Sequence, residues 1–238
     1  MKDAFGYALF NYWKGNHKTP HTLKRDDGRA DKESLKHYFE KYPQFSSIEK
    51  RALKYARGKI LDVGCGAGRH VLYFQNKGFN VLGIDESPLA VKVCKERGCR
   101  QVKIMDILKP KLKAKTFNTI ILFGNNLGIG GDLKGTKKLL KILRRLAKKD
   151  GILLLSSIDV KATKDKGHIN YQKRNLKQGK YIGLLKIRIE YKNLIGDWFD
   201  WVMVEPKVLK QLASETGWET KKVFRGNWGH YTAVLRVR

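Results

Sequence analysis

The amino-acid sequence predicts an α/β protein built around a doubly wound, mostly parallel sheet. Two observations support this prediction. Between residues 59 and 158, short apolar runs alternate with amphipathic stretches of helical length. Hydrophobic residues make up 42% of the 238-residue chain, which is enough for a sizeable core. Strands that alternate with helices need crossover connections, which are right-handed and give a parallel sheet covered by helices on both faces.

The alternating region contains five predicted strands and three predicted helices. The strands are 59–64, 80–85, 100–106, 117–123 and 152–158, and the helices are 69–78, 87–98 and 132–151. The first, fourth and fifth strands are nearly continuous apolar runs, as expected for strands that are buried on both faces. Ser87 and Pro88 begin the second helix, and Gly78 and Gly98 end the first two.

After residue 160 the pattern changes. Residues 161–180 are basic and polar, and we expect them to be irregular. Residues 181–191 and 197–206, joined by 192–196, predict an antiparallel hairpin insertion. The segments after it are a predicted helix with an early proline and a closing antiparallel pair, at 206–218, 219–226 and 230–238. The closing pair brings the predicted sheet to seven strands.

The first 57 residues form an aromatic-rich extension that we expect to be helical or irregular. Residues 4–13 predict a short helix, and Asp27–Gly28 marks a turn. Residues 46–58 predict a helix with a serine cap and a glycine stop.

The charge of the chain is strongly one-sided. There are 50 Lys and Arg against 22 Asp and Glu, which gives a formal net charge of +28. Such an excess predicts a polyanionic partner, either nucleic acid or an anionic membrane surface. The alternative is a cation-rich composition without a specific partner, as in heat-adapted surfaces rich in lysine.

The cysteines and the N-terminus bear on the cellular compartment. Cys65, Cys94 and Cys99 are odd in number and form no Cys-x-x-Cys pair, so we expect neither a disulfide framework nor a thiolate metal site. The N-terminus lacks the pattern of a signal peptide, and no apolar run approaches the roughly 20 residues of a membrane span. The sequence therefore predicts a cytoplasmic protein with no metal and no membrane association.

A glycine-rich segment, LDVGCGAGRH at residues 61–70, follows the first predicted strand and precedes a helix. A strand, a glycine-rich turn and a helix form the usual nucleotide-binding corner of a doubly wound sheet. The dinucleotide pattern Gly-x-Gly-x-x-Gly fails, because Arg69 stands where the last glycine is required. The bland alternative is a tight turn that binds no ligand.

The arrangement Asp62-x-Gly64-x-Gly66-x-Gly68 resembles the first motif of the class I methyltransferases, Rossmann-like enzymes that use S-adenosylmethionine (SAM). The resemblance covers residues 58–158. It implies that Asp62 orients the loop and binds the ammonium group of SAM, and that Asp85 accepts the ribose hydroxyls. It also implies adenine contacts from Asp106 and Ile107, and places Phe123 in the cofactor site.

Two adjacent amides, Asn125 and Asn126, follow the fourth predicted strand and are bracketed by Gly124 and Gly128. The sequence here is similar to methyltransferases that act on exocyclic base amines, which place Asn or Asp, then two prolines and an aromatic residue, after this strand. The resemblance implies that Asn125 and Asn126 are catalytic and that Asn125 holds the amine. The prolines and the aromatic residue are missing, so stacking on the base has to come from elsewhere. The bland alternative is a ligand-free turn, since asparagine tolerates left-handed backbone angles.

Candidate substrate-binding residues lie in the two aromatic segments that flank the fold and in the basic segment 161–180. They are Tyr7, Asn11, Tyr12, His168, Tyr171, Trp198 and Asp200. Basic side chains near aromatics suit RNA phosphates and unstacked bases. A solvated loop is the alternative for 161–180, and at least one tryptophan of residues 197–201 is expected to be structural.

These observations predict a SAM-dependent methyltransferase that acts on an amine nitrogen. The preferred substrate is an exocyclic amine of cytidine in structured RNA, with ribosomal RNA ahead of tRNA, because YWKGN and GNNLG look like archaeal ribosomal RNA methyltransferases. Residues 58–238 would form the methyltransferase domain, with a substrate-side insertion at 160–205, and 1–57 would contribute to the substrate site. The alternatives are a small-molecule amine methyltransferase, a protein methyltransferase and a non-catalytic SAM-binding module.

Overall fold

The computed structural model describes residues 3–238. The chain divides into two compact units, each made of several segments. Unit 1 comprises Met1–Phe45, Ile60–Lys111 and Lys186–Phe199. Unit 2 comprises Ser46–Lys59, Leu112–Leu185 and Asp200–Arg238.

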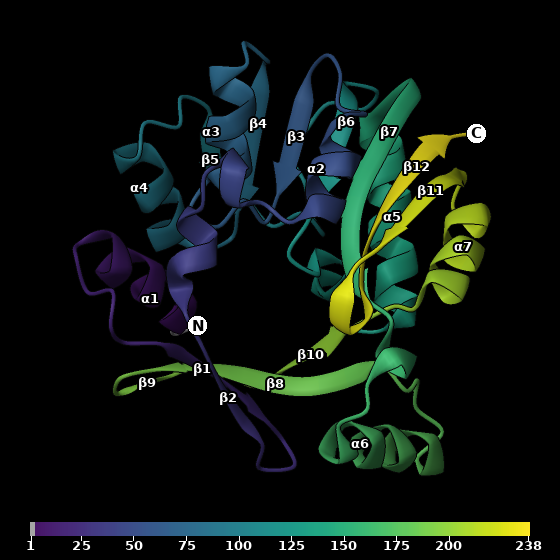
Figure 1. Cartoon of the computed structure of the whole chain (residues 1–238). Helices are drawn as coiled ribbons and strands as arrows, with labels where there is room; N and C mark the ends of the chain where they lie inside the picture. Colours follow the sequence, from purple (N-terminus) through teal and green to yellow (C-terminus); the bar gives the residue numbers. More distant parts are fainter. Residues whose placement is uncertain (1–2) are drawn as a thin grey trace. The chain divides into compact units, whose positions relative to one another are not determined.

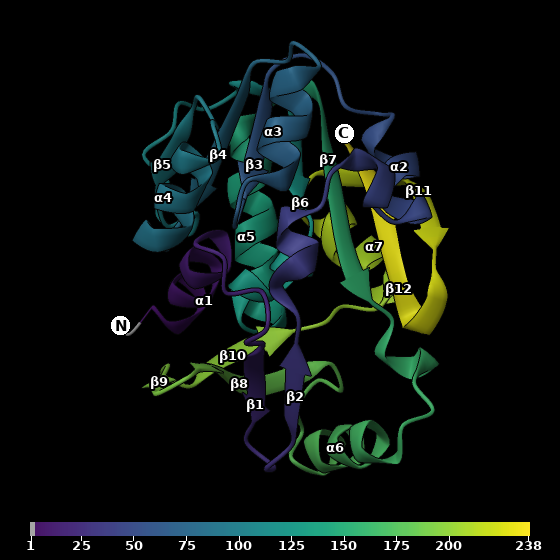
Figure 2. The ribbon, with the colours of Figure 1, turned by 60° about the vertical axis from the view of Figure 1, so that its left-hand side comes forward.

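Unit 1 contains three parallel strands, β3 (Ile60–Val63), β4 (Val81–Asp85) and β5 (Val102–Ile104). Two helices connect them, α3 (Arg69–Asn76) and α4 (Pro88–Glu96). The first helix, α1 (Ala4–Trp13), packs against α4, as Figure 2 shows. The 3-10 turns η1 (Leu35–Phe39) and η2 (Tyr42–Gln44) complete the helical part of this unit.

The Asp3 carboxylate fixes α1 to the start of α4. Its Oδ1 accepts a hydrogen bond from the Gly6 N–H at 2.8 Å, which caps the helix. Its Oδ2 accepts one from the Ser87 hydroxyl at 2.6 Å, and the Ser87 hydroxyl in turn caps α4. The two N-terminal caps are therefore joined, and α1 buries Ala8 and Leu9 in the apolar cluster of unit 1.

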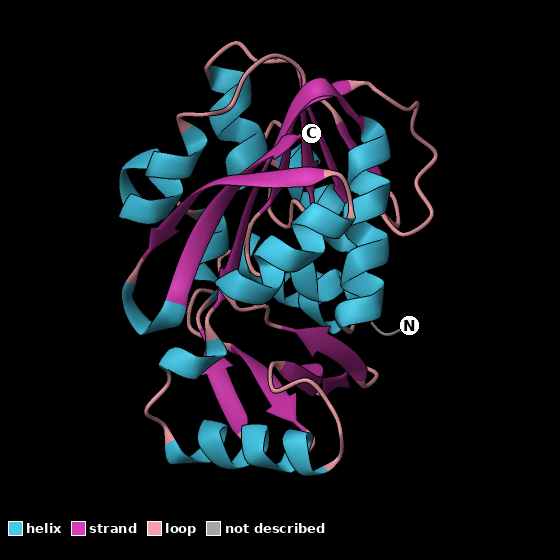
Figure 3. Ribbon diagram, turned by 90° about the vertical axis from the view of Figure 1, so that its right-hand side faces the viewer, coloured by secondary structure: helices cyan, strands magenta, loops and turns pink. Residues whose placement is uncertain are grey.

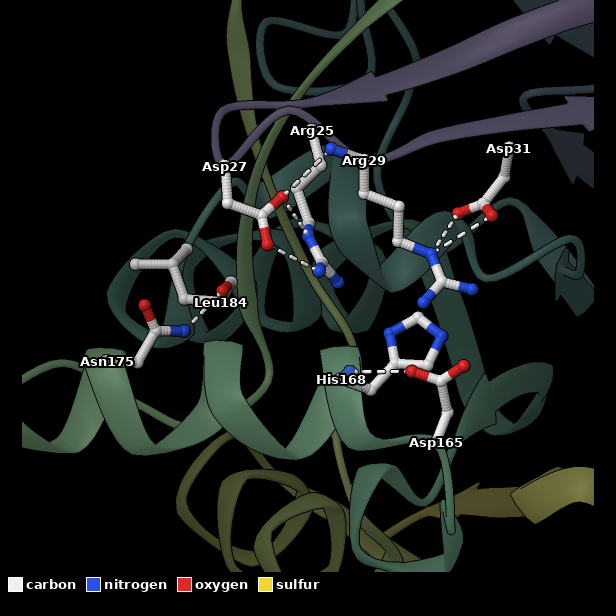
Figure 4. A network of polar contacts seen from close by, with 8 residues as sticks. All are labelled: Arg25, Asp27, Arg29, Asp31, Asp165, His168, Asn175 and Leu184. Carbon is white, nitrogen blue, oxygen red and sulfur yellow. Dashed lines mark hydrogen bonds and ion pairs between the residues drawn. The ribbon is translucent and has the colours of Figure 1, made fainter.

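A second sheet begins with a hairpin that the sequence did not predict. The strands β1 (His21–Arg25) and β2 (Ala30–Glu33) pair antiparallel around the turn at Asp27–Gly28. The ion pairs Arg25–Asp27 and Arg29–Asp31 lie at the tip of this hairpin (Figure 4). The expectation that residues 1–57 are only helical or irregular was therefore wrong. The pairing partner on the other side of β1 is β8, which lies far away in sequence.

The strand β8 (Leu184–Tyr191) runs antiparallel to β1 and to the short β9 (Leu194–Ile195). The order of this sheet is β10-β8-β1-β2, with β9 beside β8. Strand β10 (Phe199–Val202) is thus the neighbour of β8, as the predicted hairpin insertion requires.

Unit 2 contains the parallel pair β6 (Phe117–Leu122) and β7 (Ala147–Ile158). The antiparallel strands β12 (His230–Val237) and β11 (Trp218–Arg225) extend this pair. Its helices are α2 (Ser47–Leu53), α5 (Leu133–Leu146), α6 (Lys166–Lys177) and α7 (Pro206–Glu215). Its 3-10 turns are η3 (Asn126–Gly130), η4 (Val160–Ala162) and η5 (Asn227–Gly229). Figure 1 shows α7 against β11, with which it packs.

The strand order of the large sheet is β11-β12-β7-β6-β3-β4-β5. The predicted fold class, an α/β protein with a mostly parallel seven-stranded sheet and antiparallel additions, is confirmed. Helix α5 buries Leu139, Leu140, Leu143 and Leu146 and leaves its lysines and arginines outside this leucine face. Among the residues described, no helix combines the length and apolar character that crossing a membrane requires.

The prediction that residues 161–180 are irregular was wrong. Most of this segment forms helix α6 (Lys166–Lys177), the helix at the bottom of Figure 3. Asp165 caps it by accepting a hydrogen bond from the His168 N–H at 2.9 Å (Figure 4). Tyr171 and Asn175, one turn apart, are buried. The Asn175 side chain donates to the Leu184 carbonyl at 2.6 Å, which ties the helix to the start of β8. The helix exposes polar residues elsewhere, so the apolar periodicity that reveals a helix in sequence is weak.

His21 on β1 is a buried titratable group whose stability effect can be measured. Its side chain is 1% exposed, and burial lowers its pKa from 6.5 to about 4, with the charge of His37 acting in the same direction. The unfolded chain therefore binds more protons than the folded chain in this range, and stability falls as the pH drops from 6.5 towards 4. The full loss at low pH amounts to about 3 kcal/mol.

The measurement is chemical unfolding of the wild type and His21→Gln between pH 7 and 4. We expect the wild type to lose stability more steeply than the variant. Burial raises the pKa of Glu33, which opposes the trend in both proteins, so the difference between them isolates His21. The exposed His17→Gln is the control and should follow the wild type. Parallel curves for His21→Gln and the wild type would contradict the prediction.

Candidate functional site

The glycine-rich loop joins β3 to α3 in unit 1. Strand β3 is buried along its whole length, and the N–H groups of Gly64 and Cys65 both donate to the Ile84 carbonyl on β4. Gly64, Gly66 and Gly68 have φ values of 68°, 53° and 79°. Only glycine adopts this left-handed region readily. The glycine spacing therefore places three left-handed residues within the five residues 64–68.

The Asp85 carboxylate, at the end of β4, is bonded to the loop. Its Oδ2 accepts a hydrogen bond from the Gly66 N–H at 2.9 Å, and its Oδ1 accepts one from the Ser87 N–H at 3.0 Å. Burial raises the pKa of Asp85, while the two N–H groups act to lower it. The predicted ribose acceptor thus stands at the loop, as the end of an adjacent strand in a nucleotide-binding corner requires.

The remaining acidic and apolar candidates of unit 1 lie on neighbouring strand ends. Asp62 is buried on β3. Asp106 follows β5 by two residues and is exposed, and its Oδ1 accepts the Leu108 N–H at 2.7 Å. Ile107 is buried beside it. Burial and the charges of Asp85, Asp106 and Asp3 raise the pKa of Glu86, so these carboxylates are electrostatic neighbours.

Tyr38 on η1 lies against the glycine-rich loop and was not among the residues predicted from the sequence. A Cβ atom built on Gly66 would lie 3.6 Å from Cδ1 of Tyr38, so the ring faces the loop. Burial raises the pKa of Tyr38, and the charges of Arg69 and Asp85 also act on it. Its only sequence signal was membership of an aromatic-rich stretch, since no motif marks residues in a single 3-10 turn.

All three cysteines are free, buried thiols: Cys65 belongs to the loop itself, and Cys94 and Cys99 lie against Gly68. The Cys94 thiol donates to the Gly66 carbonyl at 3.0 Å, and its sulfur lies 3.9 Å from that of Cys65. The contact with Cys94 acts to lower the pKa of Cys65, but burial and the charges of Asp85 and Asp62 together raise that pKa to about 11. The thiols are therefore neutral packing groups that support the loop. No cluster of three His, Cys, Asp or Glu side chains suited to a metal ion occurs in residues 3–238.

The two amides lie in unit 2, in the turn between β6 and η3. Gly124 and Asn125 both have left-handed backbones, with φ of 72° and 60°. The Asn125 N–H donates to the Ser156 hydroxyl at 3.3 Å, and the Asn125 carbonyl accepts from the Gly128 N–H at 2.9 Å. The backbone of Asn125 is thus held, whereas its side-chain amide makes no hydrogen bond to any residue that the structure describes. Phe123, a predicted cofactor residue, is buried at the end of β6.

Trp201 is the aromatic residue that lies on this amide turn. A Cβ atom on Gly128 would lie 2.2 to 2.4 Å from three atoms of the Trp201 indole, so the ring packs directly on the glycine backbone. Asp200, a predicted residue, lies near Gly131 at the end of the same turn. Trp198, which was predicted to bind substrate, belongs to unit 1 and has Arg188 4.7 Å above its ring. Nothing in the DWFDW pattern distinguishes the two tryptophans.

The other predicted substrate residues lie on two helices. On α1, Tyr7 is 48% exposed, Tyr12 stacks on Phe39 with ring centres 4.7 Å apart, and Asn11 is half-buried. On α6, His168 is half-buried, and Tyr171 is buried with Arg174 4.3 Å above its ring.

Comparisons with known proteins agree with this geometry. The model of the methyltransferase-domain family matches residues 54–213. The chain is similar to a SAM-dependent methyltransferase from Bacteroides fragilis, solved in complex with S-adenosyl-L-homocysteine. The two share 29% identity and a TM-score of 0.85, over 99% of this chain and 95% of that one.

More distant relatives share the fold. A SAM-dependent methyltransferase from Methanosarcina mazei matches with 19% identity and a TM-score of 0.64, over 81% of this chain and 98% of that one. A protein described as a methyltransferase from Geobacillus sp. (strain WCH70) is 25% identical over 131 residues. That match spans about half of each protein, 52% of this chain and 52% of the relative.

Gly68 provides a direct test of how tightly the loop is packed. A Cβ atom there would lie 2.6 Å from the Cys99 sulfur and 2.9 Å from the Cys94 sulfur, at a φ of 79°. Gly78 has a similar φ of 81° with nothing within 4 Å of its Cβ position. We expect Gly78→Ala to cost about 1 kcal/mol of unfolding free energy through backbone strain alone. Gly68→Ala should cost roughly 2–4 kcal/mol, because overpacking adds to the strain.

Denaturant unfolding of both variants measures the two losses, and binding of S-adenosylhomocysteine by calorimetry measures the effect on the loop. Weaker ligand binding should accompany Gly68→Ala only. Equal losses in the two variants would show that the thiols give way and that the loop is not tightly packed.

The loop geometry fits SAM: the glycine backbone allows close approach, and a fixed carboxylate stands at the end of the next strand. The SAM prediction is confirmed by the family and by the S-adenosylhomocysteine complex of the Bacteroides fragilis relative. With a family match over more than half of its length and the confirmed seven-stranded sheet, the chain belongs to the class I SAM-dependent methyltransferases.

Proposed function

We propose that this chain methylates the exocyclic amine of a cytidine base in structured RNA, with ribosomal RNA as the preferred substrate. The observation that supports this most directly is the side-chain amide of Asn125. It projects from a left-handed turn after β6, its backbone is held by Ser156, and it makes no hydrogen bond to the described residues. A polar group fixed in this way is available to a ligand.

The chemistry of an amine acceptor suits an asparagine. SAM supplies a methyl group made electrophilic by its sulfonium. The Asn125 side-chain oxygen accepts a hydrogen bond from the exocyclic N–H, which orients the nitrogen and draws its lone pair away from the ring. Positioning of this kind is the main contribution of an enzyme to a direct displacement. Water can take the proton that the amine loses, so no basic side chain is required.

The strand order supports this role for the amide turn. Strand β6 follows β3 in the sheet order, and ligands of doubly wound sheets bind at the carboxyl ends of the strands. The amide turn follows the carboxyl end of β6, and the glycine-rich loop follows that of β3. We therefore propose that the amide turn contacts the acceptor.

Trp201 supplies the aromatic surface that the sequence motif lacks. Related base-amine methyltransferases carry two prolines and then an aromatic residue after the amide, and here Asn126, Leu127 and Gly128 follow Asn125 instead. The Trp201 indole packs on Gly128, three residues from Asn125, and is half-buried. Base–aromatic stacking contributes about 1–3 kcal/mol per base. We assign Trp201 the stacking role for the acceptor base.

The charge favours RNA over a small acceptor. The net charge of +28 suits a phosphate backbone, and α6 exposes Lys166 and Lys177 on a capped, ordered helix. The protein would act in the cytoplasm, whose reducing conditions suit its three free thiols.

Radiolabelled SAM tests the substrate class directly. The purified protein is incubated with separate RNA, protein and metabolite fractions, and the labelled product is digested and analysed by mass spectrometry. We expect label in the RNA fraction as a methylated cytidine. We also expect the KM for RNA to rise steeply with added salt, because phosphate contacts release counterions. Label in the metabolite fraction with no salt dependence would favour a small-molecule amine and overturn the RNA proposal.

Two substitutions separate cofactor binding from acceptor positioning. Asp85→Asn should weaken S-adenosylhomocysteine binding by roughly 10- to 100-fold, because the amide cannot accept from both N–H groups and the ribose as a carboxylate does. Asn125→Gly keeps the left-handed backbone and removes the amide. It should leave that affinity unchanged and lower kcat roughly 100-fold, as loss of a positioning group does.

Asp132→Asn, the same chemical change at the cap of α5, is the control for Asp85→Asn and should bind like the wild type. Asn125→Asp keeps an acceptor oxygen and should retain more activity than Asn125→Gly. Full activity of Asn125→Gly would remove Asn125 from the mechanism.

A further inference from the structure

Trp228 is the most exposed large hydrophobic residue that the structure describes. It lies in turn η5, between β11 and β12 in unit 2, and its side chain is 87% exposed. It makes no hydrogen bond, ring contact or ion pair with the described residues. An exposed indole leaves a large apolar surface in water, and tryptophan is mostly buried in folded proteins. Packing within the fold therefore does not explain why a tryptophan stands at this hairpin tip.

The backbone of Trp228 adds a second, independent observation. Its φ and ψ are 57° and 28°, in the left-handed region that bulky residues avoid. Asparagine or glycine would occupy this position at lower cost. Strained residues of this kind persist where the surroundings enforce them, and they concentrate at functional positions.

The turn around Trp228 is held on both sides. The Asp159 N–H donates to the Gly229 carbonyl at 2.8 Å, and the Gly226 N–H donates to the His230 carbonyl at 2.8 Å. A Cβ atom on Gly229 would lie 2.5 Å from the Asp159 carbonyl oxygen. The turn thus packs closely on the segment that begins η4, and the indole is presented on a rigid base rather than on a loose loop.

The surroundings of the indole are cationic. Arg225 flanks the turn and is exposed, and η4 leads into Lys164 and Lys166, which are also exposed. Asp159 is already paired with Arg225, with 3.3 Å between Nη1 and Oδ2. The tip therefore combines an unpartnered aromatic face with unpaired lysines, which is the arrangement that binds single-stranded nucleic acid by stacking and phosphate contact.

We propose that Trp228 stacks on an unpaired base of the RNA substrate, at a contact distinct from the acceptor base, and anchors the RNA on the η4–η5 surface. The inference rests on the proposed RNA substrate. The η4–η5 surface comprises residues 159–164 and 225–230. Its cations hold the phosphates of the same strand.

The test uses fluorescence anisotropy with a short single-stranded RNA carrying fluorescein, over a series of potassium chloride concentrations. Trp228→Asn removes the ring and relieves the strained backbone. It should weaken RNA binding by roughly 5- to 100-fold, as loss of one stacked base does. The salt slope should not change, because no charge is removed. Lys164→Ala should reduce that slope by about 0.7, one phosphate contact on a single strand.

Stability separates a functional from a structural role. Trp228→Asn should raise the midpoint of thermal unfolding or leave it unchanged, while Trp228→Phe should retain most of the RNA affinity. Tyr55→Ala, which removes another exposed aromatic ring of unit 2, is the control and should bind RNA like the wild type. Binding of S-adenosylhomocysteine should be the same in all four variants.

Unchanged RNA affinity of Trp228→Asn would overturn the proposal. So would a loss of binding to anionic phosphatidylglycerol vesicles in this variant with RNA binding intact, which would make the surface membrane-directed. RNA that binds through Trp228 but receives no methyl group would support the contact and refute the proposed function. Methylated RNA whose affinity ignores Trp228 would do the reverse.

Discussion

The hydrogen bond from the Gly66 N–H to the Asp85 carboxylate fixes the glycine-rich loop of unit 1. It joins the loop after β3 to the end of β4 at 2.9 Å. Without it, a loop with three left-handed glycines at alternate positions would have many conformations of similar energy. The thiols beneath the loop and the paired caps of Asp3 and Ser87 add packing around the same point. The roles proposed for the neighbouring carboxylates presuppose this fixed loop.

The amide turn, for which we propose contact with the acceptor, is built differently. Ser156 holds the backbone of Asn125, and Trp201 covers Gly128, yet the Asn125 amide has no hydrogen bond among the described residues. Trp228 follows the same logic at the surface. Neither side chain contributes a hydrogen bond or ring contact to the described fold, which is why we propose a ligand contact for each.

The sequence predicted those helices and strands whose formation depends on residues close together in the chain. The five alternating strands, the capped α4 and the closing pair were all readable, because apolar runs and glycine stops act within a few residues. The β1–β2 hairpin was missed because its outer partner β8 is distant in sequence, and α6 because a polar helix tied down by Asn175 shows little periodicity. In the site, the glycine loop and Asp85 came from a motif. Trp201 and Tyr38 did not, since which of several aromatics faces a turn depends on tertiary packing.

The two hydrogen bonds that the Asp85 carboxylate accepts have a consequence for ligand exchange. Both of its oxygens are already bonded to backbone N–H groups, yet a carboxylate oxygen has a second lone pair with which to accept a hydroxyl. In the role proposed for Asp85, a ribose hydroxyl would therefore add a hydrogen bond without breaking either of these two. The loop is ordered when the chain folds, so ligand binding would cost little further conformational entropy. The loop would therefore keep its conformation when the product leaves and the next cofactor binds.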